Sequence, residues 1–474
     1  MVSTIGWTVE DWKKAHYSAT PKESFKLLIN LLKSQKAAPE DPAWISLATV
    51  EDLTHQWNFL QTKANKTSLP LYGVPIAVKD NIDAKGFETT AACPSFAYKP
   101  EKDATTVKLL RDAGAIIIGK TNLDQFATGL VGTRSPYGIT PNTFNKEFVS
   151  GGSSAGSASV VARGIVPISL GTDTAGSGRV PAALNNIIGL KPTKGVFSCS
   201  GVVPACKSLD CVSIFSTTLK DAQLTFEIMA KEDGENDEYS REMPANPLLK
   251  FSKKPRVVVP TNLIWCGETE NPGLYNKAVE IFGNDVGADL VSLDIEPLLE
   301  LARCLYEGPW VTERFVAVRD FLAINPPTKD LDPTVLKIIK GGEHYSAAQC
   351  FEFEYKRQKI LQKVKRLLKG VDAIIVPTAP LTPKIEDVLA EPIKVNSCQG
   401  TYTNFVNLAD MSALAIPAGF RKDGQPFGIT LLSHKFNDYA LLDLASRYME
   451  SYTKTVPFFY GALKDKLIES TITE

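Results

Sequence analysis

Short apolar segments alternate with helical segments along much of this chain, and this alternation limits the folds that it can adopt. Residues 73–79, 115–118 and 166–170 are predominantly apolar, and helical segments at 105–113 and 157–163 separate them. Continuous apolar strands that alternate with helices are typical of a largely parallel sheet covered on both faces. We therefore predict an α/β fold built on a large mixed, mostly parallel β-sheet with helices on both faces.

The pattern continues towards the C-terminus, with predicted strands at 256–259 and 372–376 and a long amphipathic helix at 347–369. A charged stretch with two prolines near 231–254 is the best candidate for a surface excursion. Because the α/β pattern resumes after this stretch, we predict that residues 71–474 form a single catalytic domain.

The first 70 residues differ from the rest because they indicate only helices, at 7–17 and 21–36. Thr8 and the acidic residues that follow it are typical of a helix start. The second segment carries apolar residues at helical spacing. We predict that residues 1–70 form a helical arm or cap packed on the main domain.

Charge and cysteine content narrow the classes of function. The 52 basic and 53 acidic side chains nearly cancel, so no general field attracts nucleic acid. No apolar run reaches the roughly 18 residues of a membrane helix, and the start lacks a signal-peptide pattern. The eight cysteines have no zinc-site spacing. We expect a cytoplasmic protein with free thiols, without a metal, a cofactor, a membrane or nucleic acid as partner.

The segment Gly114–Thr121 matches the phosphate-loop pattern GxxxxGK[ST]. Its four variable positions are Ala-Ile-Ile-Ile, which we expect inside the sheet. Backbone N–H groups that are paired within a sheet cannot point at phosphate oxygens, so we interpret the match as coincidence.

The segment Gly152–Gly156 matches the GxSxG motif of α/β-hydrolases, which requires a preceding strand and a histidine partner. Here a loop at 141–147 precedes the match, and none of the four histidines lies in a motif. We therefore expect no Ser-His-Asp triad.

Serine and lysine remain as candidate catalytic groups. Lys79 ends the first apolar strand, and a desolvated lysine can act as a base near neutral pH. Ser150–Ser157 is rich in glycine and serine, and Gly171–Pro181 has the small residues of a sharp turn after a strand. Successive N–H groups of such a turn can converge on one oxygen, as in an oxyanion hole. Taken alone, Lys79 also fits a strand-end lysine that reaches solvent. The segment Ser150–Ser157 also fits a flexible linker, and Gly171–Pro181 an ordinary strand-to-helix turn.

Taken together, these three segments resemble the amidase signature family. The resemblance runs from about Leu71 to Leu219 and includes the segments 124–127 and 189–195. It resumes weakly at 427–431. It implies the fold of that family, which agrees with the sheet predicted above.

The resemblance implies a Ser–cis-Ser–Lys triad. Ser177 would be the nucleophile, Ser153 the bridging serine in a cis peptide and Lys79 the ultimate base. The oxyanion would be held by the backbone N–H groups of Thr174, Ala175, Gly176 and Ser177. Ala175 stands where many members have glycine, a change that keeps the backbone donor.

Two segments, 126–137 and 305–314, resemble those of allophanate hydrolases. Eight residues separate Tyr306 from Arg314, about two helical turns, so we expect both on one helix and in one pocket. Our hypothesis is that these two side chains bind the carboxylate of allophanate, while the Gly129 carbonyl receives the amide nitrogen. The alternative for Arg314 is a surface helix arginine.

The resemblance also implies a reaction and partners. Allophanate, a small-molecule amide, would lose ammonia and leave N-carboxycarbamate, as part of urea degradation. The resemblance further suggests a homodimer. Related enzymes carry a C-terminal allophanate hydrolase domain for that product, and fungal ones add a biotin-dependent urea carboxylase. No Ala-Met-Lys-Met biotin-attachment sequence occurs here, so we expect the chain to be an amidase domain.

Three alternatives remain open. The first is another amidase, such as an aliphatic amidase or the A-type component of a glutaminyl-tRNA amidotransferase, for which glutaminase activity is the discriminator. The second is a noncatalytic scaffold, which would not be labelled at Ser177 by a fluorophosphonate. The third is a nucleotide-binding module at 114–121, which ATP would protect against heat or proteolysis.

Overall fold

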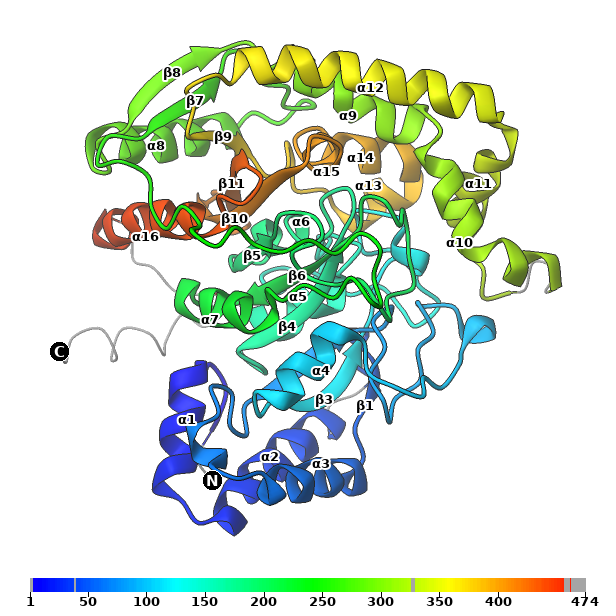
Figure 1. Ribbon diagram of the computed structural model, residues 1–474, viewed down its shortest axis with the longest axis vertical. Helices are drawn as coiled ribbons and strands as arrows, with labels where there is room; N and C mark the ends of the chain where they lie inside the picture. Colours follow the sequence, from blue (N-terminus) through cyan, green and yellow to red (C-terminus); the bar gives the residue numbers. More distant parts are fainter. Residues whose placement is uncertain (1–2, 38–39, 325–328, 456–460, 462–474) are drawn as a thin grey trace.

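One continuous sheet of eleven strands runs through the computed structural model, which describes residues 3–37, 40–324, 329–455 and 461 (Figure 1). The strand order is β1-β3-β2-β4-β6-β5-β10-β11-β9-β7-β8. In chain order the strands are β1 (Trp44–Leu47), β2 (Pro75–Lys79), β3 (Ile116–Thr121), β4 (Ile168–Asp173), β5 (Ile188–Lys191), β6 (Cys211–Ser216), β7 (Arg256–Pro260), β8 (Asp289–Leu293), β9 (Ala373–Pro377), β10 (Met411–Phe420) and β11 (Pro426–His434).

Parallel pairing is confined to two blocks of this sheet. β2 pairs in parallel with β3 and β4, and β7 pairs in parallel with β8 and β9. The other six pairs are antiparallel, including the whole central run from β4 to β9. The large mixed sheet agrees with the prediction. The sheet is less parallel than we expected, because the central strands β5, β6, β10 and β11 all pair antiparallel. None of these four strands was predicted from the sequence.

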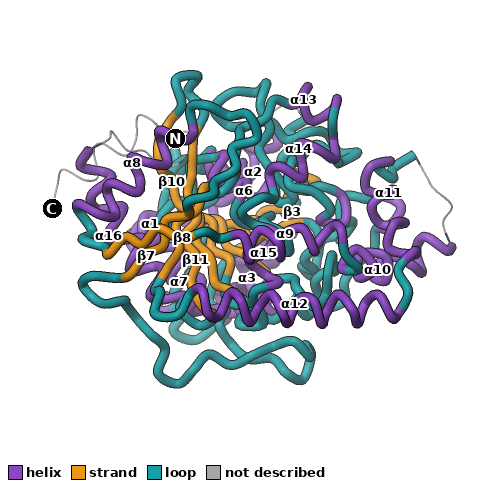
Figure 2. The backbone as a smooth tube through the Cα atoms, turned by 90° about the horizontal axis from the view of Figure 1, so that it is seen from above, coloured by secondary structure: helices purple, strands orange, loops and turns teal. Residues whose placement is uncertain are grey.

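Helices cover both faces of the sheet (Figure 2). α8 and α16 contact β10 from one side, and α6 and α15 contact it from the other. In the described ranges, no helix is long and apolar enough to cross a membrane. The α-helices are α1 (Val9–Ser18), α2 (Pro21–Lys36), α3 (Val50–Thr62), α4 (Thr105–Asp112), α5 (Ala155–Ala162), α6 (Val180–Leu184), α7 (Leu219–Met229), α8 (Asn271–Asn284), α9 (Glu296–Glu307), α10 (Trp310–Ile324), α11 (Pro333–Gly341), α12 (Ala347–Leu367), α13 (Ile385–Ala390), α14 (Pro392–Gln399), α15 (Asn404–Leu408) and α16 (Asp438–Thr455).

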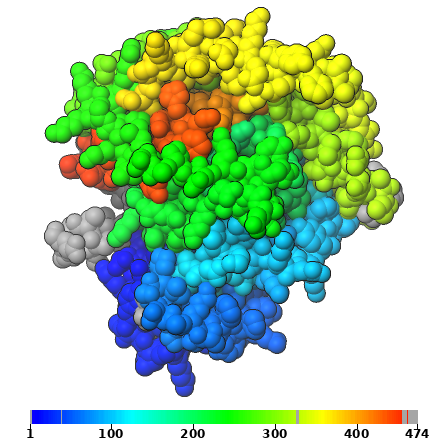
Figure 3. Space-filling model, viewed as in Figure 1, coloured from blue at the N-terminus to red at the C-terminus, as the bar shows by residue number. Residues whose placement is uncertain are grey.

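The N-terminal segment contains the predicted helices and one strand that was not predicted. α1 begins after Thr8, whose hydroxyl accepts the N–H of Asp11 while the Asp11 carboxylate accepts the N–H of Thr8. β1 pairs antiparallel with β3 and so extends the sheet. Its four residues are too few to show a periodicity in the sequence. Figure 3 shows this segment at one end of the molecule and α12 at the other.

Residues 231–254, between α7 and β7, contain neither helix nor strand. The segment lies against the loop after β5, because the Arg241 N–H donates to the Gly195 carbonyl at 2.7 Å. The Arg241 guanidinium also pairs with Asp410, which precedes β10. This charged excursion therefore crosses the loops at one edge of the central strands.

A disulfide overturns the expectation that all cysteines are free thiols. Cys266, in the loop before α8, is bonded to Cys398 of α14, with the two Cα atoms 6.5 Å apart. The two cysteines are 132 residues apart in sequence, and only the folded arrangement of these loops reveals the pair. The free cysteines are Cys93, Cys199, Cys206, Cys211, Cys304 and Cys350.

Candidate active site

Lys79 is the last residue of β2, and its side chain is fully buried. The Nζ atom lies 2.8 Å from the hydroxyl oxygen of Ser153 and 2.7 Å from that of Thr172 on the adjacent strand β4. A neutral amine keeps two N–H donors and one lone pair. It can therefore donate to the threonine while it accepts a proton from the serine.

Burial lowers the pKa of Lys79 from 10.5 to about 7. The carboxylates of Asp124, Asp173 and Asp210 act in the opposite direction, and the Arg314 guanidinium adds to the lowering. A lysine with this pKa is neutral in about half of the molecules at neutral pH. It can therefore act as a proton acceptor under ordinary conditions.

Ser153 follows a cis peptide bond with Gly152. Its carbonyl accepts the N–H of Asp124 at 3.0 Å. The carboxylate of Asp124 accepts the N–H groups of Gly132 and Arg134, each at 3.0 Å. Asp124 therefore closes the loop of residues 124–134 and ties it to the main chain at Ser153.

Ser177 lies in the loop after β4 and exposes 3% of its surface. Its hydroxyl donates to the Gly129 carbonyl at 3.4 Å. No hydrogen bond joins it to Ser153 within the described part of the chain. Lys79 and Ser153 are thus in contact, whereas the link from Ser153 to Ser177 is open. Such a link commonly tightens only when substrate binds.

The Ser177 loop is anchored by a buried ion pair between Asp173 and Arg179. Two guanidinium nitrogens lie 2.8 and 2.9 Å from the two carboxylate oxygens, and both side chains are fully buried. Burial by itself would raise the pKa of Asp173, but the Arg179 guanidinium holds it below its usual range. The carboxylate therefore stays ionised and can organise the loop.

The predicted oxyanion donors are not equivalent. The Gly176 N–H already donates to the Asp173 carboxylate at 3.0 Å. The N–H groups of Thr174, Ala175 and Ser177 have no acceptor among the described residues. These three are therefore the amides that remain available to an oxyanion, while Gly176 holds the shape of the loop.

Tyr306 and Arg314 contact each other, but they lie on different helices. The expectation of one helix is wrong because Gly308 and Pro309 end α9 and start the turn into α10. The Arg314 guanidinium nevertheless lies 3.4 Å from the Tyr306 hydroxyl. The two side chains are therefore neighbours, as the sequence predicted, but the turn between α9 and α10 brings them together rather than a single helix.

Arg314 is not a surface arginine, since it exposes only 3% of its surface. Its guanidinium donates to the Thr128 hydroxyl at 3.0 Å and to the Ala127 carbonyl at 3.3 Å. Gly129, whose carbonyl accepts from Ser177, is the next residue. This segment therefore connects the guanidinium with Ser177, the predicted nucleophile.

Three residues at the site were not identified from the sequence. Thr172 contacts Lys79, Asp173 organises the Ser177 loop, and Asp210 accepts the Thr174 hydroxyl. The sequence did contain a signal for Asp173, because it stands in a glycine-rich turn whose backbone N–H groups can donate to a carboxylate. For Thr172 and Asp210, only the strand pairing reveals the contacts.

The structure agrees with the rejection of the phosphate-loop and GxSxG matches. Residues 116–121 of the phosphate-loop match form β3, so their backbone groups are paired in the sheet. Residues 141–147 before the GxSxG match form a loop with one isolated bridge. Of the histidines, His16 is buried against the Gly73 carbonyl, far along the chain from either serine.

The chain belongs to the amidase family, whose model "Amidase" matches residues 28–442. It is 65% identical over 449 residues to urea amidolyase from Lachancea kluyveri, an alignment that covers 95% of this chain and 24% of that protein. The chain thus spans about a quarter of that relative's length.

Two other comparisons bear on the site. The S177A variant of Kluyveromyces lactis allophanate hydrolase superposes with a TM-score of 0.97 at 65% identity, covering 98% of this chain and 76% of that one. The A-type component of glutamyl-tRNA(Gln) amidotransferase from Symbiobacterium thermophilum is 36% identical over 423 residues, covering 82% of this chain and 85% of that protein.

Proposed function

We propose that this chain is an allophanate hydrolase that releases ammonia from the terminal amide of allophanate. The observation that carries the proposal is the position of the buried Arg314 guanidinium, which donates to Ala127 and Thr128. The next residue, Gly129, accepts a hydrogen bond from the Ser177 hydroxyl through its carbonyl. Allophanate has a carboxylate at one end and an amide at the other. A guanidinium that binds the carboxylate by two parallel hydrogen bonds would hold the amide at the nucleophile.

The first half of the reaction forms an acyl-enzyme. Neutral Lys79 takes the proton of Ser153, and Ser153 takes the proton of Ser177. The Ser177 oxygen then bonds to the terminal amide carbon, and the carbonyl oxygen becomes an oxyanion. The free N–H groups of the Ser177 loop stabilise this charge. The carbon–nitrogen bond breaks, and the relay returns its proton to the departing ammonia.

The second half releases the product. A water molecule gives a proton to the same relay and bonds to the acyl carbon. The ester bond to Ser177 then breaks, and the serine regains its proton. The product is N-carboxycarbamate, which carries a second carboxylate where the substrate had its amide.

The similarity to urea amidolyase and to allophanate hydrolase supports this substrate. By the same similarity, we infer that the chain is part of a urea-degrading enzyme, with a C-terminal allophanate hydrolase domain and a biotin-dependent urea carboxylase in the full-length protein. We further infer a cytoplasmic homodimer, in which residues 71–474 form the catalytic domain and residues 1–70 an arm packed on it.

The test is the initial rate of ammonia release from allophanate by the purified chain, with Ser177→Ala as the matched control. We expect rapid release that is lost in the variant, while both proteins show the same circular dichroism spectrum. A folded wild-type chain that releases no ammonia from allophanate contradicts the proposal.

The similarity to a component of a tRNA-dependent amidotransferase makes glutamine the competing substrate. The same ammonia assay with glutamine distinguishes the two, because glutamine has an ammonium group where allophanate has none. We expect at least about 100-fold lower kcat/KM for glutamine, since its carboxylate lies farther from the amide than that of allophanate, and Arg314 would repel the adjacent ammonium group. Equal or faster glutamine hydrolysis would favour the amidotransferase activity.

A further inference from the structure

Asp210 is a buried carboxylate beside the loop that carries Ser177. It immediately precedes β6, at the end of the antiparallel ladder in which Asp173 pairs with Cys211. One further step along an antiparallel ladder brings residue 210 opposite residue 174. The strand pairing itself therefore sets this carboxylate next to Thr174, the first residue of the loop.

The hydrogen bonds of Asp210 join two segments. Its carboxylate accepts the Thr174 hydroxyl. It also accepts the N–H of Ala205 at 2.8 Å and that of Cys206 at 3.2 Å. Because all these partners are donors, the site fits an ionised carboxylate better than an amide of the same shape.

A second tie between the same segments makes the arrangement rigid. The side-chain amide of Asn407 donates to the main-chain carbonyls of Asp173 at 2.8 Å and Leu209 at 2.9 Å. All three residues are buried. With both segments fixed to each other, Asp210 sets the orientation of Thr174 directly.

Asp173 and Asp210 hold the Ser177 loop in different ways. Asp173 accepts the N–H groups of Gly176 and Gly178, which are then unavailable to substrate. Asp210 instead accepts the side-chain hydroxyl of Thr174, so the backbone N–H of that residue stays available. Asp210 thus orients the Thr174 N–H without accepting a hydrogen bond from it.

Asp210 also acts on the base by its charge. The charged groups that face Lys79 are Asp124, Asp173, Asp210 and Arg314. The three carboxylates raise the pKa of Lys79 against the effect of burial. Removing one of them therefore lowers that pKa and extends the neutral form of the lysine to lower pH.

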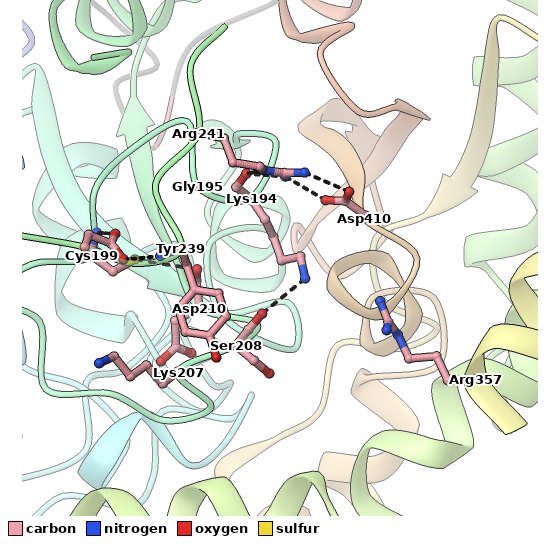
Figure 4. A pocket seen from close by; sticks show the side chains of 11 residues that line it. Lys194, Gly195, Cys199, Lys207, Ser208, Asp210, Tyr239, Arg241, Arg357 and Asp410 are labelled. Atoms are coloured by element: carbon pink, nitrogen blue, oxygen red, sulfur yellow. Dashed lines mark hydrogen bonds and ion pairs between the residues drawn. The ribbon is translucent and has the colours of Figure 1, made fainter. Parts of the chain in front are cut away.

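A cavity of about 180 Å³ borders Asp210, and Figure 4 shows the side chain there beside Ser208, Lys207 and Tyr239. Burial raises the pKa of Asp210 to about 6. The titratable and charged groups that interact with its carboxylate are Lys79, Arg314, Cys199, Cys206 and Cys211. Lys194, Lys207 and Asp237 line the same cavity. Asp237 therefore offers a matched carboxylate on the same cavity that makes no contact with the Ser177 loop.

We propose that Asp210 is a positioning residue for amide hydrolysis: through the Thr174 hydroxyl it aims the Thr174 N–H at the oxyanion, and its charge acts on Lys79. The inference rests on the proposed function, because it requires an oxyanion to form at Ser177.

The test compares Asp210→Asn, Thr174→Val and the double variant in ammonia release from allophanate. Asp210→Asn should lower kcat about 10- to 100-fold with KM changed less than about threefold, because a misaimed donor weakens only transition-state binding. The acid limb of its pH–kcat profile should move to lower pH. Thr174→Val keeps the Asp210 carboxyl group, so it should lower kcat while moving that limb less than Asp210→Asn does.

The double variant and a control complete the test. If Asp210 acts through Thr174, the double variant is no slower than the slower single variant, whereas independent roles give multiplied losses. Asp237→Asn should leave both kcat and the acid limb unchanged. Wild-type kcat in Thr174→Val, multiplied losses, or an unmoved acid limb in Asp210→Asn overturns the inference, and the Thr174→Val result stands even if Asp210→Asn does not fold.

Failure of the proposed function is a separate outcome. A wild-type chain that releases no ammonia contradicts the substrate, and the rate at which a fluorophosphonate labels Ser177 then replaces the assay. The phosphonyl oxygen occupies the oxyanion position, so Asp210→Asn should slow labelling about 10-fold or more. Labelling at the wild-type rate overturns the positioning role.

Discussion

The Lys79 side-chain nitrogen lies 2.8 Å from the Ser153 hydroxyl oxygen, and both side chains are fully buried. We predict that kcat/KM rises with pH through about 7. Burial lowers the pKa of Lys79 to about 7, so the neutral amine that accepts the proton predominates only above that pH. Below it, the rate should fall about tenfold per pH unit.

The measurement is a pH–rate profile of ammonia release, with stability of the protein checked at each pH. Lys79→Met keeps the apolar stem and removes the base, so we expect kcat to fall by about 10³ or more. A profile that stays flat from about pH 5.5 to 8 would show that a neutral Lys79 is not required.

Gly152 has no room for a side chain. A Cβ atom there would lie 2.1 Å from the Asp124 carboxylate and 2.6 Å from the Gly132 nitrogen. We predict that Gly152→Ala costs about 1–3 kcal/mol of unfolding free energy and most of the activity. Gly273→Ala is the control, because a Cβ there meets nothing within 4 Å. Urea denaturation of both variants decides, and equal stability would be evidence against this steric argument.

The Asp173–Arg179 pair supports both stability and activity. Arg179→Met leaves the Asp173 carboxylate buried without its partner, which we expect to cost about 3–5 kcal/mol. The exposed pair between Arg319 and Asp320 supplies the control, since Arg319→Met should cost less than about 1 kcal/mol. Chemical denaturation measures both, and a loss below 1 kcal/mol in Arg179→Met would refute the prediction.

Arg314 should discriminate for a carboxylate. We predict that Arg314→Ala raises KM for allophanate at least about tenfold, and that Tyr306→Phe has a smaller effect. Biuret, which has an amide in place of the carboxylate, is the control substrate and should lose far less. Assays at about pH 8 separate this effect from the pKa of Lys79, which Arg314 also lowers. Equal losses for the two substrates would assign Arg314 a purely structural role.

Several elements could be predicted because the local sequence carries their cause. α2 spans the predicted residues. Its start is marked in the sequence by Thr20, Pro21 and Glu23, which are all helix-start signals. β2, β3 and β4 are continuous apolar runs. By contrast, β1 is too short to show periodicity, and β10 contains Pro417, which argues against a central strand.

The candidate site was predictable in part for the same reason. Lys79, Ser153 and Ser177 lie in glycine-rich or strand-end segments whose pattern is visible in one stretch of chain. Asp210 and Thr172 act through neighbouring strands, and Cys266 pairs with a residue 132 positions away. Contacts of this kind depend on strand order, which the sequence pattern left undetermined.

β10 lies between β5 and β11, so a strand from near the end of the chain joins the sheet that the first half begins. During synthesis on the ribosome, the β5 edge therefore stays unpaired until residues 411–420 have emerged. Arg179 likewise waits for its contacts with Thr403 and Asn407. A nascent chain that stops before this point exposes an unpaired sheet edge and lacks the Arg179 contacts that support the Ser177 loop, so residues 403–420 must be synthesised before this site is complete.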